Sequence, residues 1–193
     1  MIELELKAVV PDSAALQARL RSAGAIEEFT GRMIDCRLDF ANASLTLCDE
    51  VIRIRVYRDS SGGTTASIDW KGPATGEGGY KRREELSTST GDAGTVMTIM
   101  RHLGLRVTRS IDREIVQFHV EGATVRVEHY PRMDDLVEVE GAPEAIERAI
   151  ALTGIPRGEF SADSLALFAD RYAARTGQPA ITGSEGDVVE VIS

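Results

Sequence analysis

The sequence predicts an α+β fold in which eight strands form a mainly antiparallel sheet and four helices pack against its apolar face. Two observations predict this class. In eight stretches apolar and polar residues alternate, as they do in strands with one apolar and one polar face. Four other stretches repeat apolar residues at helical spacing. If those helices cover the outside of a closed sheet, the charged faces of the strands must point inward.

The predicted strands follow one another closely along the chain, which favours antiparallel pairing. They span residues 2–7, 33–40, 51–57, 65–71, 80–87, 109–118, 122–129 and 135–141. Two connections, DSSGGT at residues 59–64 and EGAT at residues 121–124, have the composition of hairpin loops. The segment GPATGEGG at residues 72–79 is expected to be a longer, mobile loop.

The first predicted helix begins at about residue 11, with Asp12 or Ser13 as its cap and with Leu16 and Leu20 on one face. The other three are expected over residues 92–104, 142–154 and 161–175. Their apolar stripes are predicted to be core, with Val96, Ile99, Met100 and Leu103 in the second helix and Leu165, Phe168 and Tyr172 in the last.

Length and charge limit the possible classes of protein. A chain of 193 residues that is 42% hydrophobic is long enough for one domain with a sizeable core. We expect this domain over residues 1–176 and an acidic, flexible tail over residues 177–193. The net charge of -9 argues against a nucleic-acid or membrane partner. Because no apolar run reaches the ~20 residues that span a bilayer, we expect a cytoplasmic protein, with a homodimer left open.

Charged residues gather on the polar faces of the predicted strands, where residues two apart share a side. The acidic residues on these faces are Glu3, Glu5, Glu85, Glu128, Glu138 and Glu140. The basic residues are Lys7, Arg53, Arg55, Lys71, Lys81, Arg83, Arg113 and Arg126. Two carboxylates ~7 Å apart repel each other by ~2 kcal/mol at an effective dielectric constant of about 20.

A divalent cation with oxygen ligands would remove this repulsion, and Mg²⁺ or Mn²⁺ suits carboxylate and water ligands. The basic residues in turn require an anion that is rich in oxygen atoms, and arginine side chains match the geometry of phosphate. The sequence therefore predicts a metal-dependent polyphosphate site inside the closed sheet.

The charged motifs resemble, in order, those of the CYTH superfamily, the triphosphate tunnel metalloenzymes. The matching pieces are ELELK at residues 3–7, IRIR at 52–55, DWKGP at 69–73, RREE at 82–85, Arg113, RVE at 126–128 and VEVE at 137–140. The resemblance implies an eight-stranded antiparallel β-barrel tunnel in which acidic residues bind the metals and basic residues hold the triphosphate. It implies Glu5, Glu138 and Glu140 as leading metal ligands, with Glu3, Glu85 and Glu128 near them. Catalysis would depend on Glu5, Lys7, Glu138 and Glu140.

The chain departs from the family pattern at three places. Glu128 stands where relatives commonly have an aspartate. Ile111 stands in the lysine position of a Lys-x-Arg pair, with Arg109 on the same face. Asp35 and Arg37 stand where many relatives have Asp-x-Tyr. The second departure bears on the reaction more than on the fold.

Three functions are open. The superfamily includes class IV adenylyl cyclases, which would convert ATP to cyclic AMP and pyrophosphate, and triphosphatases, which would hydrolyse inorganic, thiamine or nucleoside triphosphate. A third possibility is a non-catalytic module that only binds polyphosphate. The overall pattern and the segment SADSLALF at residues 161–168 favour the cyclase, whereas Ile111 favours the triphosphatase.

Overall fold

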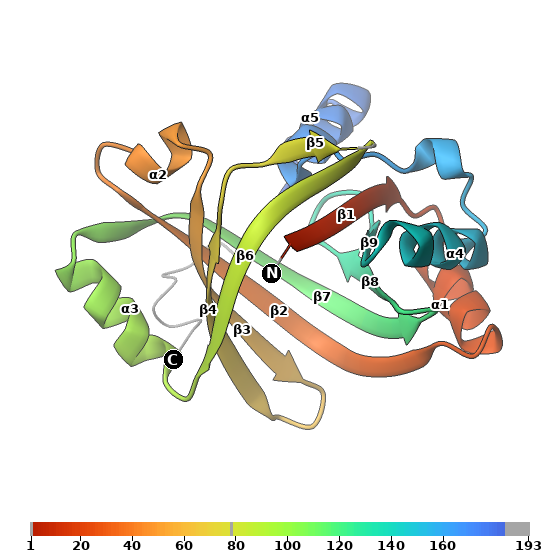
Figure 1. The fold of residues 1–193 in the computed structure, drawn as a ribbon, viewed down its shortest axis with the longest axis horizontal. Helices are drawn as coiled ribbons and strands as arrows, with labels where there is room; N and C mark the ends of the chain where they lie inside the picture. Colours follow the sequence, from red (N-terminus) through yellow and green to blue (C-terminus); the bar gives the residue numbers. More distant parts are fainter. Residues whose placement is uncertain (1, 78, 184–193) are drawn as a thin grey trace.

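The computed structural model describes residues 2–77 and 79–183, without the side chains of residues 2, 3 and 77 (Figure 1). Its centre is a closed barrel of eight antiparallel strands with one extra strand at its side, which confirms the predicted fold class. The strands are β1 (Ile2–Val9), β2 (Ile26–Phe40), β3 (Val51–Asp59), β4 (Thr64–Lys71), β5 (Thr75–Glu77), β6 (Tyr80–Thr90), β7 (Leu105–Val120), β8 (Ala123–His129) and β9 (Leu136–Glu140). The order around the barrel is β1-β9-β8-β7-β2-β3-β4-β6, and pairing of β1 with β6 closes the ring.

Two strands, β2 and β7, are much longer than the sequence predicts. They pair with each other from Ile26 opposite His119 to Phe40 opposite Leu105, so they form a long antiparallel ribbon in the wall of the barrel. The alternation is weak at the start of β2, where Gly31 has a φ of +154°. A Cβ at this position would lie 2.2 Å from the carbonyl oxygen of Arg58, so the close approach of β3 requires glycine there.

Two short elements were not predicted. The strand β5 pairs with Tyr80–Arg82 of β6 and lies in the segment that was expected to be a mobile loop. The helix α2 (Ser44–Leu47) follows β2 directly. It is held by the buried carboxylate of Asp39, which accepts hydrogen bonds from the backbone N–H groups of Leu45 and Thr46, both at 3.0 Å. This side chain therefore fixes the loop that borders the barrel interior.

The four predicted helices are present as α1 (Ser13–Ser22), α3 (Ala93–His102), α4 (Pro143–Thr153) and α5 (Leu165–Thr176), and a 3₁₀ turn spans Arg157–Glu159. Asp12 caps α1, since its Oδ1 accepts from the N–H of Ala15 at 2.9 Å. Figure 1 shows α3 at one end of the barrel and α1 with α4 at the opposite end.

Apolar outer faces of the strands meet these helices, as the alternation predicts. Leu16 and Leu20 of α1 are buried with α4 against the outer residues of β1, β8 and β9. A second cluster joins α3 to the outer residues Ile54 and Val56 of β3. A third places Phe168 of α5 beside Ile111, which shares the inward face of β7 with Arg113. The charged faces are therefore turned inward.

The prediction for α3 was partly wrong. Ile99 and Leu103 are 50% and 64% exposed, whereas Met97 is buried, so the helix is rotated relative to the predicted stripe. The outer face near Trp70 also has no helix over it among the described residues. There Trp70 lines a shallow apolar hollow, with Leu86 57% exposed at its edge.

The chain beyond α5 returns to the barrel. Ile181 and Arg132 exchange two backbone hydrogen bonds of 2.8 and 3.1 Å, and the N–H of Asp112 donates to the carbonyl of Thr182 at 2.8 Å. These contacts tie the start of the predicted tail to β7, while residues 184–193, which hold the rest of it, lie outside the described residues. In the described part of the chain, no helix has the length and apolar character needed to cross a bilayer.

Candidate active site

The inward faces of the strands enclose a cavity of about 560 Å³. The predicted site residues that line it are Glu5, Lys7, Arg53, Arg55, Lys71, Lys81, Arg83, Arg113, Glu128, Glu138 and Glu140. Arg126 and Glu85 are not among the lining residues, although both belong to inward faces. The side chain of Glu3 lies outside the described part of the chain.

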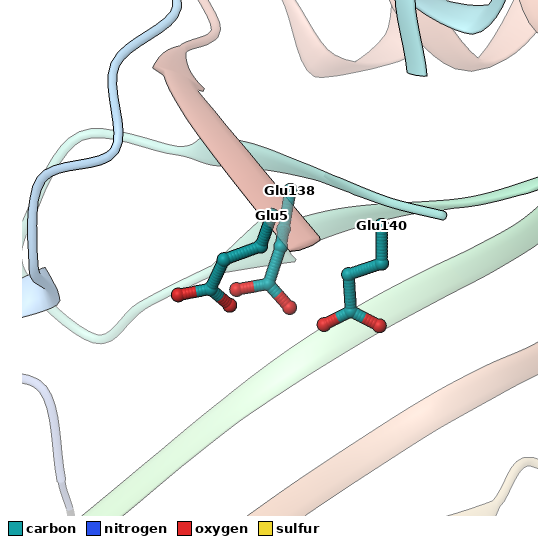
Figure 2. A group of neighbouring side chains, drawn as sticks. All are labelled: Glu5, Glu138 and Glu140. Atoms are coloured by element: carbon teal, nitrogen blue, oxygen red, sulfur yellow. The ribbon is translucent and has the colours of Figure 1, made fainter. Parts of the chain in front are cut away.

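Three glutamates meet on one wall of the cavity (Figure 2). Glu5 of β1 lies opposite Glu140 of β9, and Glu138 shares a face with Glu140 because residues two apart in a strand point the same way. One carboxylate oxygen of each residue lies within 4.8 Å of the others. Three hard oxygen donors at this separation fit the coordination that Mg²⁺ or Mn²⁺ prefers.

Basic side chains are interleaved with these glutamates. Lys7 contacts Glu5 at 3.0 Å and also forms an ion pair with Glu138, while Lys81 pairs with the other oxygen of Glu5. Arg126 Nη1 donates to Glu138 Oε1 at 2.5 Å and lies 3.5 Å from Glu140 Oε1. The repulsion expected among the carboxylates is thus compensated in the protein itself.

This compensation changes the titration of both kinds of group. Burial opposes the ionisation of Glu138, but the charges of Lys7 and Arg126 hold its pKa well below the ordinary value. Burial likewise opposes the charge on Lys7, but Glu138 and Glu5 raise the pKa of this lysine above its usual range. Glu138 is therefore ionised and Lys7 protonated at neutral pH, so Glu138 offers an anionic oxygen to a cation.

A second buried network is centred on Asp35 of β2, which is 2% exposed. Arg55 donates to Asp35 through Nε at 2.5 Å and Nη2 at 2.9 Å. Arg113 Nη2 donates to Asp35 Oδ2 at 3.1 Å, and its Nε donates to Glu128 Oε1 at 2.9 Å. Tyr130 Oη donates to the other oxygen of Glu128 at 2.5 Å.

Both oxygens of Glu128 are therefore engaged, and the structure does not bring this residue into the group of three glutamates. Glu85 is likewise separate, since it forms an ion pair with Lys71 across β4 and β6. Of the six predicted metal ligands, the structure brings together Glu5, Glu138 and Glu140.

The remaining predicted phosphate ligands also have acidic partners. Arg53 Nε donates to Asp69 Oδ2 at 2.7 Å, and Asp69 accepts from Ser87 Oγ at 2.6 Å. Arg83 contacts Asp49, which is located after α2. These arginines are oriented by carboxylates, and the bases line the same cavity as the glutamates. The arrangement can hold a cation on one wall and a chain of phosphoryl groups along the others.

Sequence reasoning missed several of these groups. Asp35 and Arg37 share the inward face of β2, so continuing the alternation along that strand would have placed both in the cavity. Tyr130 follows β8 and belongs to no periodic pattern, so nothing in the sequence indicates its hydrogen bond to Glu128.

We expect the thermal midpoint of unfolding to fall steeply below about pH 4. Burial opposes the ionisation of Asp35, but Arg55, Arg113 and Arg53 hold its pKa well below the ordinary value. A carboxyl with a depressed folded pKa adds stability that is complete above its unfolded pKa of about 3.9 and is lost as pH falls toward the folded pKa. Circular dichroism melts across the acid range test this, and a flat profile down to about pH 3 would contradict it.

Comparisons with known proteins bear on the family and on the barrel fold. A model of the CYTH domain family matches residues 1–149. No curated protein matched the chain. The solved structures that are similar include a protein from Vibrio parahaemolyticus that has been proposed to be an adenylate cyclase, with a TM-score of 0.74 and 16% identity over 88% of this chain and 98% of that one. The PH1819 protein from Pyrococcus horikoshii has a TM-score of 0.71 and 20% identity, over 86% and 96%.

A third similar structure is a protein from Hippeastrum that was proposed to be an adenylyl cyclase and has a dominant triphosphatase activity. It has a TM-score of 0.60 and 17% identity, over 92% of this chain and 96% of that one. At these identities the likeness establishes the shared barrel.

Proposed function

The chain belongs to the CYTH domain family, and from this membership we propose that it is a divalent-metal-dependent enzyme acting on a triphosphate bound inside the barrel. One observation carries the proposal. Glu5, Glu138 and Glu140 converge on the same cavity that the inward arginines and lysines line. Carboxylate oxygens suit Mg²⁺ or Mn²⁺, and guanidinium and ammonium groups suit the oxygens of a triphosphate.

The residues have distinct roles in this proposal. Glu5, Glu138 and Glu140 would hold the cation, which when bound neutralises charge on the phosphoryl oxygens and makes the attacking hydroxyl more acidic. Lys7 and Lys81 now pair with these glutamates. With a cation held by the glutamates, both ammonium groups would be available to bind the phosphoryl oxygens. In the structure as it stands, the pairing with Glu138 and Glu5 raises the pKa of Lys7 and keeps its ammonium group charged.

The first candidate reaction is that of a class IV adenylyl cyclase, in which ATP gives cyclic AMP and pyrophosphate. Here the ribose 3′-hydroxyl attacks the α-phosphorus and pyrophosphate leaves toward the arginines. The apolar part of the wall supports a nucleoside substrate. Ile111, Tyr130 and Leu165 line the cavity beside the charged groups, and they offer a surface against which a base can pack.

The second candidate is a triphosphatase, in which water attacks the terminal phosphorus of an inorganic, thiamine or nucleoside triphosphate. Ile111 favours it, since an apolar side chain lines the cavity where cyclase-like relatives would be expected to carry a lysine. The similar protein from Hippeastrum, with its dominant triphosphatase activity, is in line with this alternative. A polyphosphate-binding module without turnover is the remaining alternative.

One experiment separates these candidates. The purified protein is incubated with ATP, tripolyphosphate or thiamine triphosphate and with Mg²⁺ or Mn²⁺, and the phosphorus-containing products are identified. Cyclic AMP with pyrophosphate assigns the cyclase, and orthophosphate assigns the triphosphatase. Tight binding of a triphosphate without any product assigns the binding module, and neither binding nor turnover refutes the proposal as a whole.

Arg53→Lys is expected to weaken triphosphate binding about tenfold to a hundredfold, the range for hydrogen bonds to charged groups. Arg53 lines the cavity and is oriented by Asp69, and lysine keeps the charge but lacks the planar pair of donors. Calorimetric titration of tripolyphosphate measures the loss. Arg101→Lys on the exposed part of α3 is the matched control and should bind as the wild type does. Equal affinities of Arg53→Lys and wild type would remove Arg53 from the site.

A further inference from the structure

Two further arginines, Arg37 and Arg109, lie directly opposite each other in the pairing of β2 with β7. Arg37 also lies opposite Arg53 in the pairing of β2 with β3, and it lines the barrel cavity. The β2–β7 ladder shifts register between Arg37 and Leu38, so Thr108 is an additional residue in β7. Such irregularities commonly redirect side chains next to functional sites.

Unlike the bases described above, these two arginines have no acidic partner among the described residues. The buried Nε of Arg37 has no hydrogen-bond partner there. By contrast, Arg53 pairs with Asp69, and Arg113 pairs with Asp35 and Glu128. A buried donor without a partner costs free energy, so its presence in a cavity suggests a ligand that supplies the acceptor.

The charges around Arg37 point to the sign of that ligand. Burial, and then the neighbouring charge of Arg109, lower the pKa of Arg37 to about 10. The charge of Asp35 opposes this shift, but Arg53 and Arg113 add to the repulsion, and the net effect is a lowered pKa. Arg37 is still protonated at neutral pH, so several like charges face one another in a partly enclosed space. An oxyanion placed between the guanidinium groups would relieve the repulsion and accept from the open donors.

We propose that Arg37 and Arg109 form an additional oxyanion subsite that binds the phosphoryl group of the substrate farthest from the three glutamates. In the ring of eight strands, β2 stands opposite β1, and β3 stands opposite β9. Glu5 and Glu138 therefore occupy the wall that faces Arg37. A phosphate chain that starts at the glutamates and crosses the cavity ends at Arg37, which lines the cavity, with Arg109 opposite Arg37 in the β2–β7 pairing. The inference rests on the proposed function, because it takes the ligand to be part of the same polyphosphate substrate.

The test compares chain lengths. Pyrophosphate, tripolyphosphate and tetrapolyphosphate are titrated with Mg²⁺ into the wild type, Arg37→Gln, Arg109→Gln and the double variant, with Arg101→Gln on exposed α3 as control. We expect each single variant to lose about tenfold to a hundredfold in affinity for chains that reach the subsite, and pyrophosphate binding to be unchanged. A loss that begins with tripolyphosphate assigns the third phosphoryl group, and a loss only with tetrapolyphosphate assigns the fourth.

Thermal melts without ligand distinguish a binding role from a structural one. Because Arg37 and Arg109 repel each other, their glutamine variants should unfold at the same temperature as the wild type or higher. The subsite would be overturned if the variants bound all three phosphate chains as tightly as the wild type does, whether or not their thermal midpoint fell. It would also be overturned if the variants lost affinity equally for all three chains.

Inorganic phosphate alone separates this inference from the proposed function. It should raise the thermal midpoint of the wild type, and this rise should disappear in the double variant. If the wild type binds no polyphosphate but shows this rise, the proposed function fails and the oxyanion subsite stands. If it binds polyphosphate and both glutamine variants bind equally well, the subsite fails and the proposed function stands.

Discussion

Asp35→Asn is expected to lower the free energy of unfolding by about 3 to 5 kcal/mol, the cost of breaking a buried ion pair by removing one partner. Asp35 is 2% exposed and accepts hydrogen bonds from both Arg55 and Arg113. Asparagine keeps the shape but leaves two buried guanidinium groups without their shared countercharge. Urea denaturation followed by circular dichroism measures the change, with the midpoint and the slope analysed separately.

The matched control is Asp134→Asn, which removes one carboxylate from a pair with Arg175. The side chain of Arg175 is 61% exposed, so we expect a loss below about 1 kcal/mol. If both variants lose equally little, the barrel interior is hydrated enough to screen its charges, and the network around Asp35 does not hold β2, β3 and β7 together.

The barrel and its charged interior could be predicted from the sequence because side chains in a strand alternate with a period of two. Once Leu6 and Val137 are placed under helices, Glu5 and Glu138 must point inward. This reasoning needs only local alternation and a closed sheet. It holds even where the ends of the predicted strands differ from the structure by several residues, although Ile111 of β7 is an apolar residue that lines the cavity.

The pairing inside the barrel could not be predicted in the same way. Alternation places Glu128 and Glu85 on inward faces, but their partners depend on the register between strands that are distant in sequence. Arg113 and Lys71 form ion pairs with these two carboxylates, and among the described side chains the candidate metal ligands that meet are the remaining three glutamates. The helix α2 is too short to show a period, and its determinant, Asp39, acts through backbone N–H groups that no side-chain pattern reveals.

Glu138→Gln and Glu140→Gln are each expected to lower metal-dependent turnover about a hundredfold or more. Each variant removes one anionic oxygen ligand from the group of three, so the cation is bound less tightly and stabilises the developing charge less well. Turnover is measured as product formation from whichever triphosphate the product analysis identifies as the substrate. Calorimetric titration of Mn²⁺ measures the loss of metal affinity. Glu114→Gln, on the exposed outer face of β7, is the control and should keep both.

The two variants should differ in stability, which separates binding of the cation from a merely structural role. Glu138 is 9% exposed and pairs with buried Lys7 and Arg126, so Glu138→Gln leaves both cations undercompensated and should lower the thermal midpoint. The side chain of Glu140 is 18% exposed and lies 3.5 Å from Arg126, a longer contact than that of Glu138, so Glu140→Gln should lower the thermal midpoint less than Glu138→Gln does. Loss of turnover in Glu140→Gln without loss of stability therefore attributes the defect to the cation. Full turnover in Glu140→Gln would mean that the three glutamates serve only to neutralise Lys7, Lys81 and Arg126.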